Sequence, residues 1–440
     1  MMLQDAAPAI SAGDTAWVLV SSALVLLMIP GLALFYGGLV RSRAILNTFM
    51  MSFAALAVVG VQWVLFGYAL AFEPGVFKGS FSWLGLNGVG AAAGPYSATI
   101  PHVAFSVFQV MFAGITVALI SGAMVERIRF KVYLAFAVLW STLVYDPIAH
   151  FVWGADGFLH TLGALDFAGG TVVHITAGTA ALVAAIILGR RRDLGRTPLV
   201  PHNVPFVVAG AGLLWVGWLG FNGGSALAAD GVASNAVMTT NAAASAALVM
   251  WLILDMWKTG QATAVGGATG AVVGLVAITP AAGFVTPLAA IAIGALGACA
   301  SFTAIQLRNK TRIDDALDVF ACHGVAGMAG ALLTGVFATK AVNAAGNDGL
   351  LYGNPKQLGI QAIAVVVTIL FTAPVTLLIL TRLTFGKLRV PVPDELTGID
   401  ISEHGEHAYH EGTDLAGAGR LGEAVVFTTP KRELATSEAA

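Results

Sequence analysis

Long apolar runs are the dominant feature of this sequence. A helix needs about 20 mostly apolar residues to cross a hydrocarbon core of about 30 Å. Such runs lie at about 15–36, 44–72, 103–125, 130–152, 167–189, 204–226, 233–257, 262–280, 285–307, 318–338 and 358–383. Only 10% of the residues are charged, whereas soluble domains carry about 25%. The sequence therefore predicts an all-α polytopic membrane protein with about eleven transmembrane helices.

The basic residues predict the orientation, because cytoplasmic loops carry an excess of Lys and Arg. With the N-terminus outside, only Lys78, Lys340 and Lys356 fall on the outer side. The other basic residues then lie inside, namely Arg41, Arg43, Arg127, Arg129, Lys131, Arg190, Arg191, Arg192, Arg196, Lys258, Arg308, Lys310, Arg312, Arg382, Lys387, Arg389, Arg420, Lys431 and Arg432. We expect a multi-pass protein of the plasma or inner membrane, N-out and C-in, with a transmembrane domain at 1–388 and a cytoplasmic tail at 389–440.

Two histidines share a local pattern in spans that lie five apart. His174 is followed by Gly178, and His323 is followed by Gly327. Because the two spans are an odd number of positions apart, the two helices run in opposite directions, as inverted repeats require. We expect a five-plus-five repeat at about 15–192 and 203–338, with a final helix at 358–383.

An aspartate precedes each histidine. At a rise of 1.5 Å per residue, His174 lies about 12 Å from Asp166 along its helix, and His323 about 7.5 Å from Asp318. If both aspartates start near their own membrane faces, the two imidazoles approach a common central layer. Facing neutral imidazoles can share a proton, although two structural histidines that join helices would give the same pattern. The aspartates themselves are more typical of helix caps or loop anchors than of substrate ligands.

Aromatic residues recur at helical spacing. Phe108 and Phe112 are four residues apart, and Trp218, Phe221 and Ser225 also share one helical face. Trp153 ends its span at the outer boundary. Such residues often pack cores or anchor the membrane interface. They could also hold a small cation over their π faces, with the Ser225 hydroxyl as a hydrogen-bond acceptor.

Several motifs occur together in one order. They are GLALFYGGLVRSR (31–43), FQVMFAGITVALISGAMVERIRF (108–130), DPIAHFVWG (146–154), DFAGGTVVHITAG (166–178), GWLGFNGGS (217–225) and DVFACHGVAG (318–327). The segment DELTGIDISEHGEHAY (394–409) continues the pattern into the tail. Together they closely resemble the ammonium transporter family (Amt/Mep, related to the Rhesus proteins), bacterial type, over about 15–388 and this tail segment.

The resemblance implies a fold and a set of site residues. It implies eleven transmembrane helices, an inverted five-plus-five repeat and a homotrimer with one pore per subunit. Carried over by motif, the site residues are Phe112, Trp153 and Ser225 for the outer ammonium site, Phe112 and Phe221 for a phenyl gate, His174 and His323 for the pore, and Asp166 and Trp218 in support. A PII-type signalling protein would bind at the cytoplasmic face.

The function that follows is ammonium transport for nitrogen uptake. We expect NH4+ to bind at the outer aromatic site and lose a proton, so that NH3, with or without that proton, crosses a pore lined by twin histidines. No enzyme activity, cofactor, metal or nucleic-acid partner is expected. One alternative is a Rhesus-like gas channel for NH3 or CO2, against which Trp153 and the tail argue. A second is an ammonium sensor, and a third is an intramembrane metal enzyme, for which HExxH-like spacing is missing.

Overall fold

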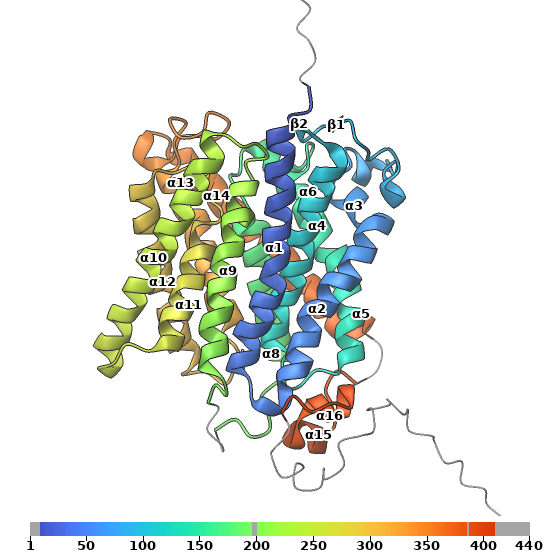
Figure 1. Cartoon of the computed structure of the whole chain (residues 1–440), viewed down its shortest axis with the longest axis vertical. Coiled ribbons are helices and arrows are strands. Elements are labelled where there is room, and N and C mark those ends of the chain that lie inside the picture. Colours follow the sequence, from blue (N-terminus) through green and yellow to red (C-terminus); the bar gives the residue numbers. More distant parts are fainter. Residues whose placement is uncertain (1–8, 196–199, 385–386, 410–440) are drawn as a thin grey trace, which may run out of the picture.

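The computed structural model describes residues 9–195, 200–384 and 387–409. The expected inner residues Arg196, Arg420, Lys431 and Arg432 lie outside these ranges, as does the tail from 410 onward. The long helices lie roughly along one axis (Figure 1). The α-helices are α1 (Ala12–Leu39), α2 (Ile45–Gln62), α3 (Tyr68–Phe72), α4 (His102–Ile120), α5 (Phe130–Trp140), α6 (Asp146–Trp153), α7 (Phe158–Leu162), α8 (Thr176–Leu188), α9 (Val204–Gly224), α10 (Gly231–Thr259), α11 (Ala264–Ile278), α12 (Pro287–Arg308), α13 (Ala326–Phe337), α14 (Pro355–Leu378), α15 (Val392–Thr397) and α16 (Ile399–His404).

Helical segments long enough to cross a membrane account for most of the predicted spans. Among the described residues, ten segments have the length and apolar composition to do so. The run at 262–280 instead forms α11, whose 15 residues fall short of the usual length of about 20. It packs against α9, α10 and α12 inside the bundle. These findings confirm a polytopic membrane protein, and the count of eleven crossings stays a prediction.

Polar side chains fix where several of the helices begin. The Ser11 hydroxyl accepts from the backbone N–H of Asp14 at 3.2 Å and so caps α1. The Asp230 carboxylate caps α10 by accepting from Ala233 N at 2.9 Å. Thr263 caps α11 in the same way, as this residue type does at many helix starts.

Some helices contain wide turns with i→i+5 hydrogen bonds, a π-helical geometry that is rare and frequent at functional sites. These turns lie at Trp63–Gly67 and Ser141–Tyr145, at Gly170–Ile175 before α8, at Phe320–Val325 before α13, and at Ile379–Leu383. The apolar pattern of the sequence did not predict them. The turns at Gly170–Ile175 and Phe320–Val325 carry His174 and His323.

The fold departs from all-α at one outer loop. Strands β1 (Ala93–Gly94) and β2 (Ser97–Pro101) pair antiparallel. They lie near the start of α1 (Figure 1), where Ser11 N donates to Thr99 O at 2.8 Å. Short 3-10 turns occupy Ser42–Ala44, Val76–Lys78, Leu84–Leu86, Ser121–Ala123 and Leu350–Tyr352.

Ion pairs tie the inner loops together at the opposite end of the bundle. The Glu126 carboxylate lies 2.8 Å from Arg41 and 3.1 Å from Arg191. The Asp314 carboxylate lies 2.9 Å from Arg191 and 3.4 Å from the fully buried Arg127. Burial would raise the pKa of Glu126, but the hydrogen bonds and charges of Arg41 and Arg191 outweigh it and hold that pKa below its ordinary value. Four loops of distant sequence are thereby joined in one charged layer.

The start of the tail docks onto this layer. Helices α15 and α16 lie at the end of the bundle away from the start of α1 (Figure 1). The Asp400 carboxylate accepts from Leu46 N at 3.1 Å and from Asn47 N at 2.9 Å, at the beginning of α2. Arg389 and Glu395 form an ion pair at 2.5 Å. The described part of the tail is therefore held against the inner ends of the transmembrane helices.

Candidate functional site

The two predicted pore histidines face each other in the middle of the bundle. His323 Nδ1 lies 3.3 Å from His174 Nδ1, and the ring planes are 26° apart with centroids at 5.4 Å. Both side chains are buried. In a neutral imidazole one ring nitrogen donates and the other accepts, so one Nδ1 carries the shared hydrogen while the other accepts it. The arrangement can hold or pass one proton without a fixed charge.

Glycines allow the two histidine helices to approach this closely. A Cβ atom on Gly178 would lie 2.2 Å from Gly324 N, and one on Gly327 would lie 3.0 Å from Gly170 O and 3.1 Å from His174 Cβ. Gly178 has no room for a side chain, and one at Gly327 would require its neighbours to shift by a few tenths of an ångström. The repeated spacing of four residues from histidine to glycine therefore has a steric cause, because each glycine sits where the partner segment crosses.

Trp218 and Thr279 fix the orientation of the first imidazole. The Trp218 ring stacks on His174 with centroids 5.3 Å apart and an interplanar angle of 22°. Its Nε1–H donates to Thr279 Oγ1 at 2.8 Å, and that hydroxyl donates to Leu275 O at 2.7 Å. Trp218, which was expected beside the pore, lines the same cavity as His174 and His323. Thr279 was missed, since a threonine at the end of an apolar run gives no distinctive sequence signal.

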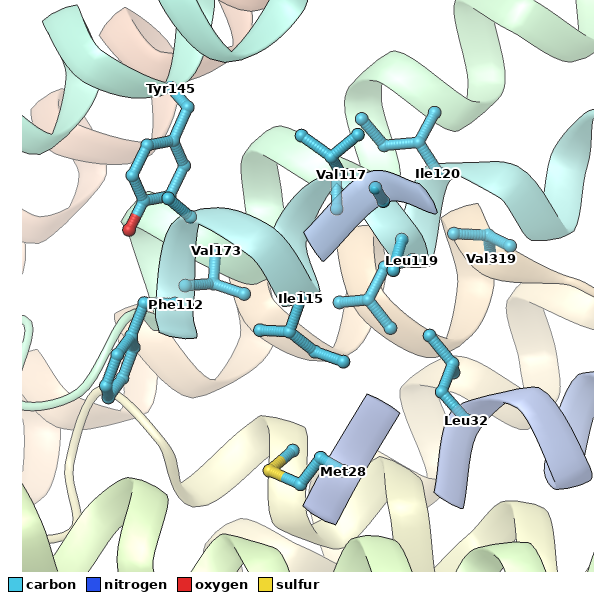
Figure 2. Packing of buried hydrophobic residues seen from close by; sticks show 14 of the residues in the cluster. Met28, Leu32, Phe112, Ile115, Val117, Leu119, Ile120, Tyr145, Val173 and Val319 are labelled. Carbon is cyan, nitrogen blue, oxygen red and sulfur yellow. The ribbon is translucent and has the colours of Figure 1, made fainter. Parts of the chain in front are cut away.

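The space around the histidines is narrow and apolar. Its free volume is about 10 Å³, about what one molecule of the size of water needs. Figure 2 shows the packing of buried hydrophobic side chains in the bundle, among them Met28, Leu32, Ile115, Leu119 and Val173. All five line the lumen together with His174 and His323. A hydrated ion would not fit there, whereas a small neutral molecule would.

The predicted outer-site residues meet in a separate cavity of about 140 Å³. Its wall consists of Phe72, Tyr96, Phe105, Gln109, Phe112, Trp153, Phe167, Ser225 and Leu227. Phe112 and Trp153 stand edge to face with centroids 6.1 Å apart. The Ser225 hydroxyl donates to Phe221 O at 2.8 Å, so its lone pairs remain free to accept. The cavity offers aromatic surface and a hydroxyl acceptor.

Two phenyl rings separate this outer cavity from the histidines. The centroids of Phe112 and Phe221 lie 4.2 Å apart, and both side chains are buried. Phe112 belongs to the wall of the outer cavity, while Phe221 lines the lumen and stacks 6.0 Å from His174. The two rings predicted as a gate therefore lie next to each other between the outer cavity and the histidine lumen.

Asp166 organises the backbone before the first histidine. Its carboxylate accepts from the backbone N–H groups of Gly169 at 3.0 Å, Thr171 at 2.9 Å and Val172 at 3.0 Å. Its own carbonyl oxygen accepts from Trp153 Nε1 at 2.8 Å. Asp166 is not among the residues that line the outer cavity, so the geometry fits the expected capping role. Trp153 is bonded inside the protein and does not act only as an interface anchor.

The corresponding cap before His323 is not the expected residue. The Asp315 carboxylate accepts from Phe320 N at 2.7 Å and caps this helix. Asp318 has a left-handed backbone with φ of 56°, and its side chain pairs with Arg308 at 2.7 Å. Of the two roles expected for Asp318, a helix cap or a loop anchor, its contacts fit the loop anchor.

A wider cavity opens on the inner side of the histidines. Its volume is about 340 Å³, and His323, Cys322 and Asp318 line it beside Tyr36 and Arg191. Arg191 belongs to the charged layer at the end of the bundle where α15 and α16 lie. The outer cavity, the phenyl pair, the histidine lumen and this inner cavity follow one another through the bundle.

The chain is similar to known proteins in both sequence and structure. Residues 16–409 match the sequence profile of the Ammonium Transporter Family. The chain is 49% identical over 402 residues to the "Ammonium transporter" of Bacillus subtilis, covering 91% of this chain and 99% of that protein. It is similar to the crystal structure of Saccharomyces cerevisiae Mep2, with a TM-score of 0.82 and 39% identity over 88% of this chain and 90% of that one. A solved "Sensor Amt Protein" shares 30% identity and a TM-score of 0.80, covering 89% and 98%.

Proposed function

Since this chain belongs to the ammonium transporter family, we propose that it binds ammonium in the outer aromatic cavity, removes a proton and conducts ammonia past the paired histidines. The observation that carries the proposal is the order of the parts. The aromatic cavity, the phenyl pair and the two imidazoles succeed one another. Phe112 lines the cavity and contacts Phe221, and Phe221 in turn stacks on His174. A cation that enters must therefore pass each in turn.

Binding at the outer cavity rests on the aromatic faces and one hydroxyl. A cation within about 6 Å of an aromatic face is attracted by the ring quadrupole, and Phe112 and Trp153 supply such faces. Ser225 accepts one N–H of the ion. None of the residues that line this cavity carries a charge, so its attraction for a cation comes from these groups.

Deprotonation follows from the loss of water at the phenyl pair. Moving an ion into an apolar space penalises its charged form, and the lumen beyond Phe221 is too small for a hydration shell. Ammonium therefore enters as ammonia, which can donate to or accept from imidazole nitrogens. His174 and His323 supply these partners without adding a charge that would trap ammonium.

The fate of the proton defines the type of transport. We propose that the proton follows along the line of the two imidazoles, so that net ammonium crosses the membrane. The shared Nδ1···Nδ1 contact at 3.3 Å supports such a path. A proton that returned outward would instead leave passive conduction of ammonia gas.

Reconstitution into liposomes with electrical recording under an ammonium gradient, at several pH values, tests this proposal. Net ammonium transport gives an inward current that saturates with ammonium concentration. A Rhesus-like gas channel would shift internal pH without a current, and a sensor with vestigial transport would give neither. The similarity to the "Sensor Amt Protein" makes the third outcome worth measuring. Either of the last two outcomes overturns the proposed mechanism.

The family resemblance also leads us to propose the assembly and its surroundings. We propose a homotrimer in the plasma or inner membrane, N-out and C-in, with 1–388 as the transmembrane domain and 389–440 as the tail. A PII-type signalling protein would bind at the cytoplasmic face, where the docked tail meets the inner loops. Native mass spectrometry of the purified protein in detergent, with and without such a protein, tests the trimer and the partner separately.

A further inference from the structure

Gln109 stands in the wall of the outer cavity without an assigned part. It precedes Phe112 by three residues on α4, so the two share one helical face, and both line the cavity. The Gln109 side chain is 9% exposed. Its Oε1 is buried and has no hydrogen-bond partner among the residues that the structure describes. A buried amide oxygen without a partner is unusual, because such groups are nearly always hydrogen-bonded.

The other polar side chains that line this cavity already donate hydrogen bonds within the protein. Tyr96 Oη donates to Phe72 O, Trp153 Nε1 donates to Asp166 O at 2.8 Å, and the Ser225 hydroxyl donates to Phe221 O at 2.8 Å. The Tyr96 oxygen also accepts from Ala155 N at 3.4 Å. Among the side chains that line this cavity, the Ser225 hydroxyl and the Gln109 amide oxygen are therefore available as acceptors for a ligand.

We propose that the Gln109 amide oxygen is a second hydrogen-bond acceptor for ammonium at the outer cavity, and that it helps the site to select this ion. The inference rests on the proposed function and deepens it. Ammonium carries four N–H donors, of which Ser225 takes one and Gln109 takes another. Rotation about the last side-chain torsion exchanges the two ends of an amide without moving the rest of the residue, so the oxygen can turn to the ion.

Two neutral oxygens also explain how the site distinguishes ammonium from potassium. Potassium filters replace the lost water shell with rings of carbonyl oxygens. One hydroxyl and one amide oxygen are too few for that purpose. They suffice for ammonium, because each of its N–H groups points at one acceptor while the aromatic faces of Phe112 and Trp153 stabilise the charge.

Paired substitutions of Gln109 test the proposal in the liposome current assay. Q109L removes the acceptor at nearly constant volume and is expected to raise the KM for ammonium about tenfold, as loss of a hydrogen bond to a charged group does. Q109E keeps an acceptor oxygen and is expected to leave that KM at or below the wild-type value, while potassium begins to compete. Val107→Ala is the matched control, because Val107 lies on the same helix with an exposed side chain and should leave the KM unchanged.

The possible outcomes distinguish the proposed role of Gln109 from the proposed transport function. If Q109L leaves the KM unchanged while Ser225→Ala raises it, Gln109 is not a ligand and the transport proposal stands. If Q109L and Q109E raise the KM equally, the amide oxygen is not what the ion uses. If the wild type itself conducts neither ammonium nor ammonia, the proposed function fails first. Q109M repeats the test with a flexible side chain should Q109L not assemble.

Discussion

The Nδ1 atoms of His174 and His323 lie 3.3 Å apart although 149 residues separate them in the chain. Each ring comes from a π-helical turn, and glycines at 178, 324 and 327 let these turns cross. Trp218 covers the face of His174. Because one Nδ1 must donate and the other accept, the two rings form a single hydrogen-bonded unit, and changing either ring changes both.

Replacing either histidine by alanine should reduce the ammonium current strongly. His174→Ala or His323→Ala removes one half of the hydrogen-bonded unit, so that ammonia loses its partners in the lumen, and we expect at least about a tenfold loss, the size of one such hydrogen bond. Current per reconstituted protein is the measurement, with size-exclusion chromatography as the control for assembly. Normal conduction with unchanged selectivity in both variants would contradict a role in conduction.

An acidic residue in the same place should change which ions pass. His323→Glu puts a fixed carboxylate in the lumen. Its negative charge would attract any monovalent cation, whether or not that cation has N–H groups to donate. We expect potassium currents that the wild type lacks, measured by replacing ammonium with potassium at constant ionic strength. A variant that stays selective for ammonium would show that the imidazoles do not set the selectivity.

Loss of the large ring at the outer cavity should weaken ammonium binding. Trp153→Leu removes a π face beside Phe112, and desolvated cation–π contacts are worth up to about 2 kcal/mol, which corresponds to a KM increase of about tenfold or more. Trp153→Phe keeps an aromatic face but loses the Nε1–H bond to Asp166 O, so it should fall between wild type and Trp153→Leu. Equal KM values in all three proteins would rule out aromatic recruitment.

The carboxylate of Asp166 should matter for stability before it matters for binding. Asp166→Ala leaves three buried backbone N–H groups without their acceptor, at a cost of about 1–3 kcal/mol for each group left unpaired. We expect a lower thermal midpoint in detergent and a weaker current, because the turn that carries His174 loses its cap. Asp166→Asn keeps one acceptor oxygen and should lose less on both counts. A full loss of current at wild-type stability would point instead to direct contact with the ion.

Acid should loosen the charged layer formed by Arg41, Glu126, Arg191 and Asp314. The arginines hold the pKa of Glu126 below its ordinary value of 4.5 and that of Asp314 below 3.8 despite burial. A carboxyl whose folded-state pKa is lowered stabilises the folded chain above its ordinary value, and that contribution disappears as pH falls through the lower folded-state pKa. The thermal midpoint should therefore drop steeply below about pH 4.5. Glu126→Gln should make the thermal midpoint depend less on pH. If the midpoint of this variant falls with pH as it does in the wild type, titration of Glu126 does not contribute to the acid sensitivity.

Sequence patterns predicted the parts of this protein that obey regular periods. Apolar runs placed the spans, and the histidine–glycine spacing brought His174 and His323 to one layer. Asp315 was missed as a cap because Asp314, Asp315 and Asp318 are all close enough to the helix start, and only the backbone turn at Asp318 decides among them. The buried Asp146, which follows the wide turn at Ser141–Tyr145, accepts a hydrogen bond from Gln62 Nε2 at 2.6 Å. This partner could not be predicted, because Gln62 belongs to another span.

The site was predicted from motifs more fully than from physical reasoning. Spacing alone placed Phe112 and Ser225 on helical faces but could not tell which faces meet, since that depends on how α4 and α9 pack. Gln109 and Thr279 were missed because neither belongs to a repeated spacing pattern in the sequence. Where each side chain lies, at the wall of the outer cavity for Gln109 and beside Trp218 for Thr279, depends on contacts between segments far apart in the chain.

The wide turns at Gly170–Ile175 and Phe320–Val325 set a constraint on length as well as on composition. An ordinary helix advances about 100° per residue, so removing or adding one residue before the histidine in either turn would move its imidazole to another side of the helix. Substitutions that keep the crossing glycines can spare the lumen, whereas an insertion or deletion of a single residue before either histidine cannot. The number of residues in each turn is therefore constrained together with the glycines at 178, 324 and 327.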